Sequence, residues 1–401
     1  MARAPDLLRL LALALVVVAC RGDYEANSIL CDDIEAICIY DDLPYETNDT
    51  VCGDKQQFLN PTRCNCGSMC IKYLEEGEEC FMKSLISFPH TLCGPSLECI
   101  SEDGFTGLCM RNPEKKCINE TLRYEAAQEE GTLGPGEYKP NCDEYGRYAG
   151  RQCSPGSTCY CVNANGERLF GEAPVTEKDT IDCACASYWE DTESRGLNMG
   201  LRCLPNGNFD TLQCADKMCY CFDPETGTIS FGPFPDFMMT DLECYDEAIH
   251  GSTYKRPCEL AVDEWESYES SDVVTIQEHA RPLCTHDGYF AAIQYEGGYA
   301  YCSDFLGKQI EDFQQAIHLS DGLTCNCARR RYIMEENGLG SNKPKCCPNG
   351  EYKPLQTRGL LAYCVDKNGN QCGPAVVTTD ITSLPCYSQN PCEDSSLIME
   401  C

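Results

Sequence analysis

The cysteines are the residues of this sequence with the widest chemical repertoire, because the 401-residue chain contains 35 of them. Cysteines two residues apart, as at Cys64 and Cys66 or at Cys159 and Cys161, can ligate zinc as thiolates or can each form a disulfide. Zinc sites commonly add histidine, of which the chain has only five. Such a high cysteine content is typical of secreted disulfide scaffolds. We therefore expect disulfides, with no metal and no cofactor.

Catalytic chemistry is not indicated by the remaining polar residues. The histidines lie outside any recognisable hydrolase motif, and carboxylates are so abundant that no spacing isolates one pair as an acid and a base. We expect no catalytic residue and no enzymatic activity. The histidines are His90, His250, His279, His286 and His318.

The charge and composition exclude several classes of protein. Lys and Arg number 31 against 64 Asp and Glu, which gives a formal charge of −33. Binding to a phosphate backbone requires clustered cations, and a strongly acidic chain is repelled by acidic membrane faces. Hydrophobic residues make up 42% of the chain even when every cysteine is included. We expect small disulfide-held domains that bind neither nucleic acid nor membrane.

The first twenty residues are predicted to be a secretion signal. Arg3 and Arg9 flank the start of an apolar run over residues 10–19, as in a signal peptide. Cleavage after Ala19 would keep an odd number of cysteines, whereas cleavage after Cys20 would leave an even number. We favour the second site and expect a secreted, extracellular protein. Asn48 and Asn119 stand in Asn-x-Thr sequences and are predicted to be glycosylated.

Cysteine spacing shows that the chain repeats itself. Residues 117–183 and 185–244 each carry six cysteines, and residues 258–325 and 327–386 repeat four of these six positions 141 to 143 residues later. We name these four segments repeats 1 to 4. Their repeating cysteines are Cys117, Cys142, Cys153, Cys159, Cys161 and Cys183; Cys185, Cys203, Cys214, Cys219, Cys221 and Cys244; Cys258, Cys284, Cys302 and Cys325; and Cys327, Cys346, Cys364 and Cys386.

The missing cysteines indicate how the others pair. Where repeat 1 has Cys153 and Cys159, repeat 3 has Tyr295 and Ala300, and repeat 4 lacks both cysteines as well. Loss of only one partner would leave a stray thiol in an oxidising compartment, so the joint loss indicates that the third and fourth cysteines pair with each other. Elimination with sequence order then predicts that the first pairs with the second and the fifth with the sixth.

A shared sequence pattern accompanies the cysteines and resembles that of a known domain family. Repeat 1 contains Gly146, Tyr148, Gln152-Cys153 and Cys159-Tyr160-Cys161-Val162, and the other repeats keep most of it. This combination resembles the thyroglobulin type-1 domain, although Tyr stands at all four sites where that family usually has Trp. The resemblance implies a small disulfide-rich multidomain fold: tandem thyroglobulin type-1 units, each with a short antiparallel sheet and a short helix, mostly loops. The tyrosines are Tyr160, Tyr220, Tyr301 and Tyr363.

Apart from Cys20, the cysteines outside the shared pattern fall into two groups. Ten of them lie in residues 21–116, where order alone does not reveal the pairing, and this cysteine-rich module is similar to the second half of the N-terminal domain of insulin-like growth factor binding proteins. Four others lie near the C-terminus, where we expect Cys347 to pair with Cys372 and Cys392 with Cys401. The ten are Cys31, Cys38, Cys52, Cys64, Cys66, Cys70, Cys80, Cys93, Cys99 and Cys109.

The resemblance implies a function as a protease inhibitor. Inhibitory members of the thyroglobulin type-1 family, the thyropins, insert a wedge of three loops into the active-site cleft of papain-like cysteine proteases without bonding to the catalytic thiol. Leu133 is predicted to make the most buried contact. The residues of repeat 1 carried over to the three loops are Thr132, Leu133, Gly134, Pro135, Ser154, Pro155, Gly156, Ser157, Thr158, Tyr160, Asn165, Gly166, Arg168 and Leu169.

A non-inhibitory function is the alternative, since glycine and proline in these loops also suit a plain spacer domain. In that case the protein would be an extracellular matrix or growth-factor-binding adaptor, with its partner on residues 31–109. For the chain as a whole we predict a helix over residues 120–130 ended by Gly131, a hinge in the linker 245–257, and a disulfide-closed tail at 387–401.

Overall fold

The computed structural model describes residues 56–59, 69–81, 91–101, 104–143, 145–196, 200–224, 228–251, 253–269, 280–340 and 343–392. These residues divide into two compact units, of which the second holds residues 95–97 and everything described from residue 111 onward. The predicted signal segment, Asn48 and the cysteines before residue 69 lie outside the described residues. Among the residues that are described, no helix combines the length and the hydropathy that crossing a membrane requires.

The N-terminal module contains two three-stranded sheets. One has the order β1-β2-β4, with β2 and β4 parallel, and the other has the order β3-β6-β5. Within its described residues, the disulfides Cys80–Cys99 and Cys93–Cys109 close it. The strands are β1 (Gln56–Leu59), β2 (Met69–Leu74), β3 (Glu79–Phe81), β4 (Thr91–Cys93), β5 (Leu97–Ile100) and β6 (Thr106–Arg111).

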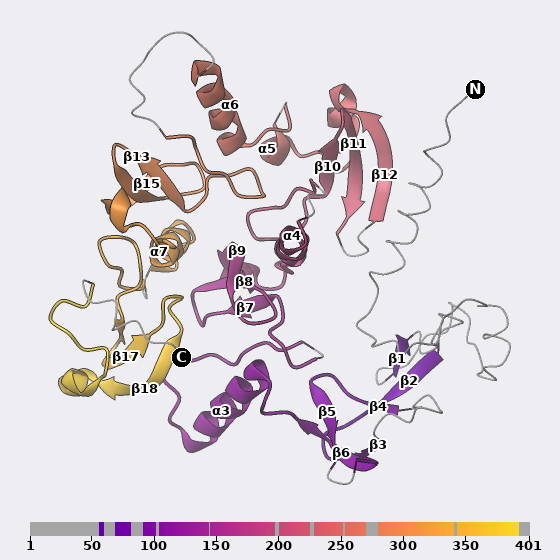
Figure 1. The fold of residues 1–401 in the computed structure, drawn as a ribbon, viewed down its shortest axis with the longest axis vertical. Coiled ribbons are helices and arrows are strands. Elements are labelled where there is room, and N and C mark those ends of the chain that lie inside the picture. The colour runs from indigo at the N-terminus through magenta and orange to yellow at the C-terminus, as the bar shows by residue number, and fades with distance from the viewer. Residues whose placement is uncertain are drawn as a thin grey trace. The chain divides into compact units, whose positions relative to one another are not determined.

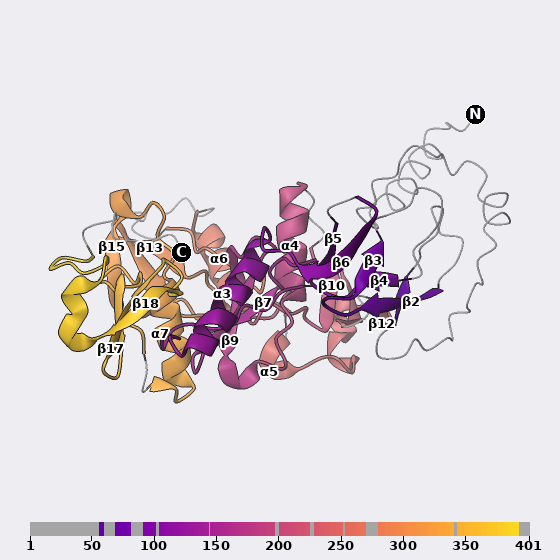
Figure 2. The same cartoon turned by 90° about the horizontal axis from the view of Figure 1, so that it is seen from below.

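Each of the four repeats has the same plan, which Figures 1 and 2 show as a series of helix and sheet pairs running from violet to yellow. A helix comes first, and a three-stranded antiparallel meander and a short 3-10 helix follow it. The fold class inferred from the sequence, disulfide-rich tandem units of small sheets and short helices, is therefore confirmed.

The bounds of these elements are as follows. Repeat 1 has α3 (Lys116–Glu130), β7 (Arg151–Cys153), β8 (Thr158–Val162), β9 (Arg168–Pro174) and η1 (Val175–Glu177); repeat 2 has α4 (Ala184–Ser194), β10 (Leu212–Ala215), β11 (Met218–Asp223), β12 (Thr228–Pro235) and η2 (Asp236–Asp241). After α5 (Glu247–His250), repeat 3 has α6 (Pro257–Glu269), β13 (Ile293–Glu296), β14 (Tyr299–Ser303), β15 (Gln309–Ala316) and η3 (Ile317–Leu319). Repeat 4 has α7 (Asn326–Glu336), β16 (Leu355–Arg358), β17 (Leu361–Val365), β18 (Gln371–Val377) and η5 (Thr378–Ser383).

The helix predicted in repeat 1 is present and longer than expected. It ends before Gly131, whose φ of 69° is the left-handed conformation that glycine adopts without a steric penalty. It begins at Lys116 rather than at residue 120, because its first turn contains Cys117 and Ile118, which are both buried.

The disulfide pairing inferred from the missing cysteines is confirmed. Within each repeat the first cysteine bonds to the second and the fifth to the sixth, and repeats 1 and 2 add the middle bridges Cys153–Cys159 and Cys214–Cys219. The Cα atoms of each middle bridge are only 4.0 Å apart, since these cysteines lie directly opposite each other on paired strands.

The pairing expected near the C-terminus is wrong. Cys347 bonds to Cys392 rather than to Cys372, which is also disulfide-bonded. Cys372 lies on β18 opposite Cys364 of β17, whereas Cys347 lies in the loop before β16. Proximity in the sequence was therefore a poor guide to proximity in space. Cys401 lies outside the described residues.

All four repeats contain a glutamine that joins the loop before the sheet to the first strand. In repeat 1 the Gln152 side chain accepts from the Asn141 N–H at 2.9 Å and donates to the carbonyls of Asn141 and Ala149. All three hydrogen bonds recur at the equivalent residues of the other repeats, Gln213, Gln294 and Gln356. This explains why all four repeats have glutamine at this position, since its buried amide forms hydrogen bonds with backbone groups that would otherwise lack partners.

Consecutive repeats join in the same way within each pair. The Cys161 sulfur of repeat 1 packs against Gly207 of repeat 2, where a Cβ atom would lie only 2.6 Å from it. The Cys302 sulfur of repeat 3 packs in the same way against Gly350 of repeat 4, where a Cβ atom would lie only 2.3 Å from it. In both junctions the glycine carbonyl also accepts a hydrogen bond of 3.0 Å from a backbone N–H of the helix that begins the second repeat. The donor is Ala186 in the first pair and Ala328 in the second. The two pairs of repeats therefore have the same junction, as expected if a block of two repeats was duplicated.

The segment expected to be a hinge is anchored to repeat 2. Asp210 of that repeat bonds to the His250 Nε2 at 2.9 Å and to the Arg256 guanidinium at 2.5 Å, and all three side chains are about 1% exposed. The Nδ1 atom of His250 accepts from the Asp246 N–H, so the ring donates from Nε2. A buried carboxylate thus ties His250 and Arg256 to repeat 2.

We predict that Asp210→Ala lowers the free energy of unfolding by about 3–5 kcal/mol, because it leaves the Arg256 charge buried without a partner. Denaturant unfolding under non-reducing conditions measures this loss. Asp241→Ala, an exposed aspartate of the same repeat, is the control and should change stability by less than about 0.5 kcal/mol. Equal effects of the two substitutions would contradict the anchoring role.

Candidate functional site

The loops of repeat 1 that were predicted to bind a protease are built from tight, internally bonded turns. The loop after α3 is fixed by the Thr132 N–H, which donates to the Ala127 carbonyl at 2.9 Å. The turn between β7 and β8 is closed by the middle disulfide and by the Ser157 N–H bonded to the Ser154 carbonyl. In the turn between β8 and β9, the Asn163 side chain accepts from two backbone N–H groups. All three loops are therefore held by local contacts.

Two of these loops contact repeat 4. The Gly136 N–H donates to the Gln371 side-chain oxygen at 2.8 Å, and Arg358 donates to the Pro135 carbonyl at 2.9 Å. In the second loop, the Ser157 hydroxyl lies 3.3 Å from the Met334 sulfur. The first and second loops thus face another part of the same chain.

The predicted contact residues differ widely in exposure. Tyr160 is only 2% exposed, and its hydroxyl is 2.8 Å from that of Tyr138 and 3.0 Å from the Asn370 oxygen. Burial raises the pKa of Tyr160 above its ordinary value, so it serves as a neutral hydrogen-bonding residue at the contact with repeat 4. Thr158 is buried as well; Leu133, Gly134, Pro135, Ser154, Ser157, Gly166, Arg168 and Leu169 are half-buried; and Thr132, Pro155, Gly156 and Asn165 are exposed.

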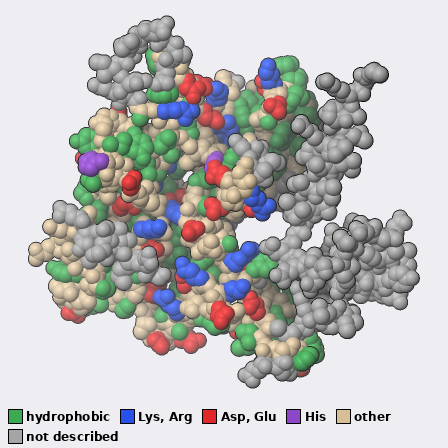
Figure 3. Space-filling model, viewed as in Figure 1, with side chains coloured by type: hydrophobic (Ala, Val, Ile, Leu, Met, Phe, Trp, Pro, Cys, Tyr) green, Lys and Arg blue, Asp and Glu red, His purple; other side chains and the backbone are tan. Residues whose placement is uncertain are grey.

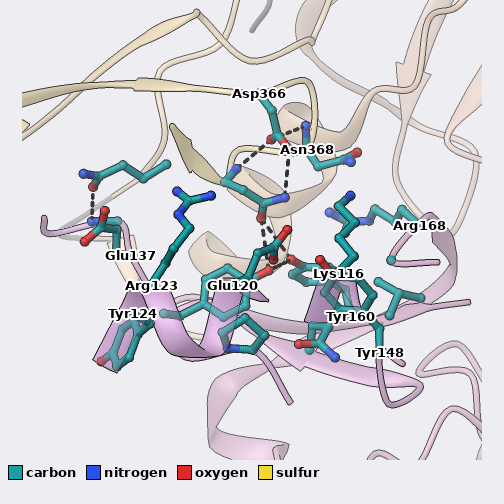
Figure 4. A pocket seen from close by; sticks show the side chains of 18 of the residues that line it. Lys116, Glu120, Arg123, Tyr124, Glu137, Tyr148, Tyr160, Arg168, Asp366 and Asn368 are labelled. Atoms are coloured by element: carbon teal, nitrogen blue, oxygen red, sulfur yellow. Dashed lines mark hydrogen bonds between the residues drawn. The ribbon is translucent and has the colours of Figure 1, made fainter. Parts of the chain in front are cut away.

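A large cavity of about 1280 Å³ lies between repeat 1 and repeat 4, beside their contacts. Figure 4 shows Lys116, Glu120 and Arg123 of α3 on one wall, with Asp366 and Asn368 of repeat 4 opposite them. Cations and carboxylates alternate along the lining, and Figure 3 shows the same mixture on the molecular surface. The cavity was not foreseen from the sequence, because its two walls are more than 200 residues apart.

No catalytic arrangement appears among the residues that line this cavity. The lining contains neither cysteine nor histidine, and it pairs no nucleophile with a base. One group of three cysteine sulfurs, those of Cys80, Cys93 and Cys109, is compact enough to hold a metal. All three form disulfides and so cannot act as thiolate ligands.

A second feature missed from the sequence is the narrow end of each repeat, which we call its tip. The tip comprises the turn between the first two strands and the first two residues of the 3-10 helix, and one backbone hydrogen bond of 2.9–3.0 Å joins the turn to the first of these residues in every repeat. In repeats 2, 3 and 4 the tips expose Phe237 (81%), Ile317 (50%) and Leu360 (79%). The tip of repeat 1 is instead polar, with Ser154 and Ser157.

Comparison with known proteins agrees with this architecture. Residues 117–183 match the thyroglobulin type-1 repeat. Residues 24–119 match a family described as fungal protease inhibitor. The similarity to growth factor binding proteins in this module stays a prediction, as does the extension of the thyroglobulin type-1 family to repeats 2, 3 and 4.

Two kinds of relative share parts of the chain. Mouse thyroglobulin is 23% identical over 316 residues, which cover 62% of this chain and 11% of that protein. Human epithelial cell adhesion molecule is 41% identical over 68 residues, or 16% of this chain and 20% of that protein. The matched segment is thus a fifth or less of each relative's length.

The surroundings of Asn119 are compatible with its predicted glycosylation. This residue lies exposed on α3, and its side-chain amide donates to the Pro113 carbonyl at 3.1 Å. The abundance of disulfides suits an oxidising, extracellular compartment. Attachment of sugar and secretion both stay predictions.

We predict that Gln371→Ala speeds hydrogen exchange of the Gly136 amide by about fivefold, since one net hydrogen bond contributes roughly 1 kcal/mol. Exchange monitored by mass spectrometry or NMR measures the change. Lys367→Ala, at an exposed site of the same hairpin, should leave the rate unaltered. An unchanged rate in Gln371→Ala would mean that the first loop does not depend on repeat 4.

Proposed function

We propose that this protein is a protease inhibitor and that its targets are papain-like cysteine proteases. The observation that carries the proposal is that a segment with the thyroglobulin type-1 pattern directly follows one that matches a family described as protease inhibitor. The closed, locally bonded loops of repeat 1 support it, because they lose little conformational entropy on entering a cleft. A relation to inhibitory families favours a binding function over a catalytic one.

The mechanism that we propose is steric. The loop of residues 131–136, the β7–β8 turn and the β8–β9 turn would enter the active-site cleft together and block substrate access. No covalent bond to the catalytic thiol is required. Leu133 is the central residue of the first loop and is half-buried, so it would supply apolar contact area to the protease.

The contact with repeat 4 bears directly on this mechanism. A protease that reached the first two loops would have to displace Gln371 and Arg358 from Gly136 and Pro135. Part of the binding free energy would then be spent on separating the two repeats. Inhibition by the full chain would then be weaker than inhibition by the same loops without repeat 4 bound to them.

We predict that the full-length protein inhibits a cathepsin-L-like protease, and that Leu133→Asp weakens inhibition at least tenfold, which corresponds to about 1.4 kcal/mol. The measurement is an inhibition constant from steady-state hydrolysis of a peptide substrate. Leu360→Asp, the same change at the exposed tip of repeat 4, is the matched control and should leave the constant within twofold. Circular dichroism of both variants checks that the fold is intact.

The outcomes separate the parts of the proposal. Loss of inhibition in Leu360→Asp but not in Leu133→Asp would move the contact to repeat 4. Inhibition of serine proteases alone would retain the inhibitor and reject the papain-like target. Failure to inhibit any of several proteases would reject both.

An adaptor function is the second candidate, and one observation favours it. The N-terminal module exposes large apolar side chains on β3 and β6 and between its strands, including Phe81 (66%), Phe105 (78%) and Leu108 (47%). Exposed apolar groups of this size are typical of binding surfaces. Binding of an extracellular matrix protein or growth factor that is lost in Phe81→Asp and unchanged in Leu133→Asp would support this alternative.

A further inference from the structure

A second and smaller cavity lies where the first two loops of repeat 1 meet repeat 4. Its volume is about 80 Å³, and the backbone of residues 135–136 and 154–157 forms one wall. The opposite wall includes Arg330, Lys343 and Arg358, while no aspartate or glutamate lines the cavity. Lys343 pairs with Glu335 outside the cavity and Arg358 donates to the Pro135 carbonyl, which leaves Arg330 to be explained.

Arg330 is the cation whose hydrogen bonds are incomplete. It is only 4% exposed, and its Nε and Nη2 atoms have no hydrogen-bond partner. The nearest carboxylate, Glu172, is 3.5 Å from Nε. That carboxylate already accepts close hydrogen bonds from Arg168 and Thr158, so Arg168 and Arg330 share one negative charge.

The arginines on either side of Arg330 show that this is unusual within α7. Arg329 donates to three backbone carbonyls, including those of Phe290 and Ser303. Arg331 forms an ion pair with Glu311 at 2.7 Å. Of three successive arginines on one helix, only Arg330 is both buried and left with unpartnered donors.

Tyr352 adds a further donor to the same cavity. Its ring and that of Tyr160 each lie 5.4 Å from the Arg330 guanidinium carbon. The Tyr352 hydroxyl is buried and has no hydrogen-bond partner. Because burial raises the pKa of Tyr352, this hydroxyl keeps its proton and can donate it.

The unpartnered donors, beside a carboxylate that two arginines share, indicate a ligand of opposite charge. Burying N–H groups without acceptors is unfavourable, and an anion would both accept these hydrogen bonds and add negative charge beside Arg330. The volume is large enough for a halide ion or a tetrahedral oxyanion. We infer that this cavity binds a small inorganic anion, which Arg330 and Tyr352 hold by hydrogen bonds and Arg358 attracts by charge.

Such an anion would lie directly behind the first two loops of repeat 1. It would increase the attraction between these loops and repeat 4, whose Arg358 already bonds to the Pro135 carbonyl. This inference does not depend on the proposed inhibition, since it concerns stability and anion affinity alone.

The test measures the thermal unfolding midpoint of the full-length protein in sodium chloride, sulfate and phosphate. Each titration is made at constant ionic strength with a bulky organic salt as the balance. A bound anion should raise the midpoint by about 3 °C for every tenfold increase in concentration above its dissociation constant. If at least one of the three anions gives this dependence, the wild-type result supports the site.

Two variants assign the effect to this cavity. Tyr352→Phe removes only the unpartnered hydroxyl and should weaken anion affinity about threefold or more with the fold intact; Arg330→Met should abolish the dependence. Arg331→Met, next to Arg330 on α7, should keep it. A midpoint that does not respond to any of the three anions, or an equal response in Arg330→Met and Arg331→Met, would overturn the inference.

Discussion

The architecture depends on the disulfide between the fifth and sixth cysteines of repeats 1 and 3. In each case this bridge ties the central strand to the start of the next repeat, and its sulfur also packs against a glycine of that repeat. A side chain at Gly207 or Gly350 would overlap the sulfur. One covalent bond therefore holds a repeat together and also positions its neighbour, which is how a chain with so few large apolar residues orders successive domains.

Much of this local structure could be predicted from the sequence. The joint absence of two cysteines from repeats 3 and 4 correctly identified the middle bridge, because an oxidising compartment penalises a single stray thiol. Gly131 correctly marked the end of α3, since few other residues adopt its conformation. These inferences succeeded because each depends on one bond or on one residue's backbone.

Contacts between distant segments could not be predicted in the same way. Gly136 and Gln371 are 235 residues apart, and no sequence pattern in either segment indicates that the two are in contact. The contact of Asp210 with the segment expected to be a hinge, 245–257, was missed for a similar reason, because Asp210 belongs to the preceding repeat. Tyr160 shows the effect on the candidate site: its place in a recognised motif was evident, but its burial at the contact with repeat 4 was not.

The contact between the first and fourth repeats also distinguishes this array from an open solenoid. Linear repeat arrays leave an uncovered surface at each end and usually need specialised terminal units to shield it. Here repeat 1 and repeat 4 shield each other through Gln371, Arg358 and Tyr160. The two ends of the four-repeat array therefore cover part of each other's surface, and on that shared face neither end needs a separate capping unit.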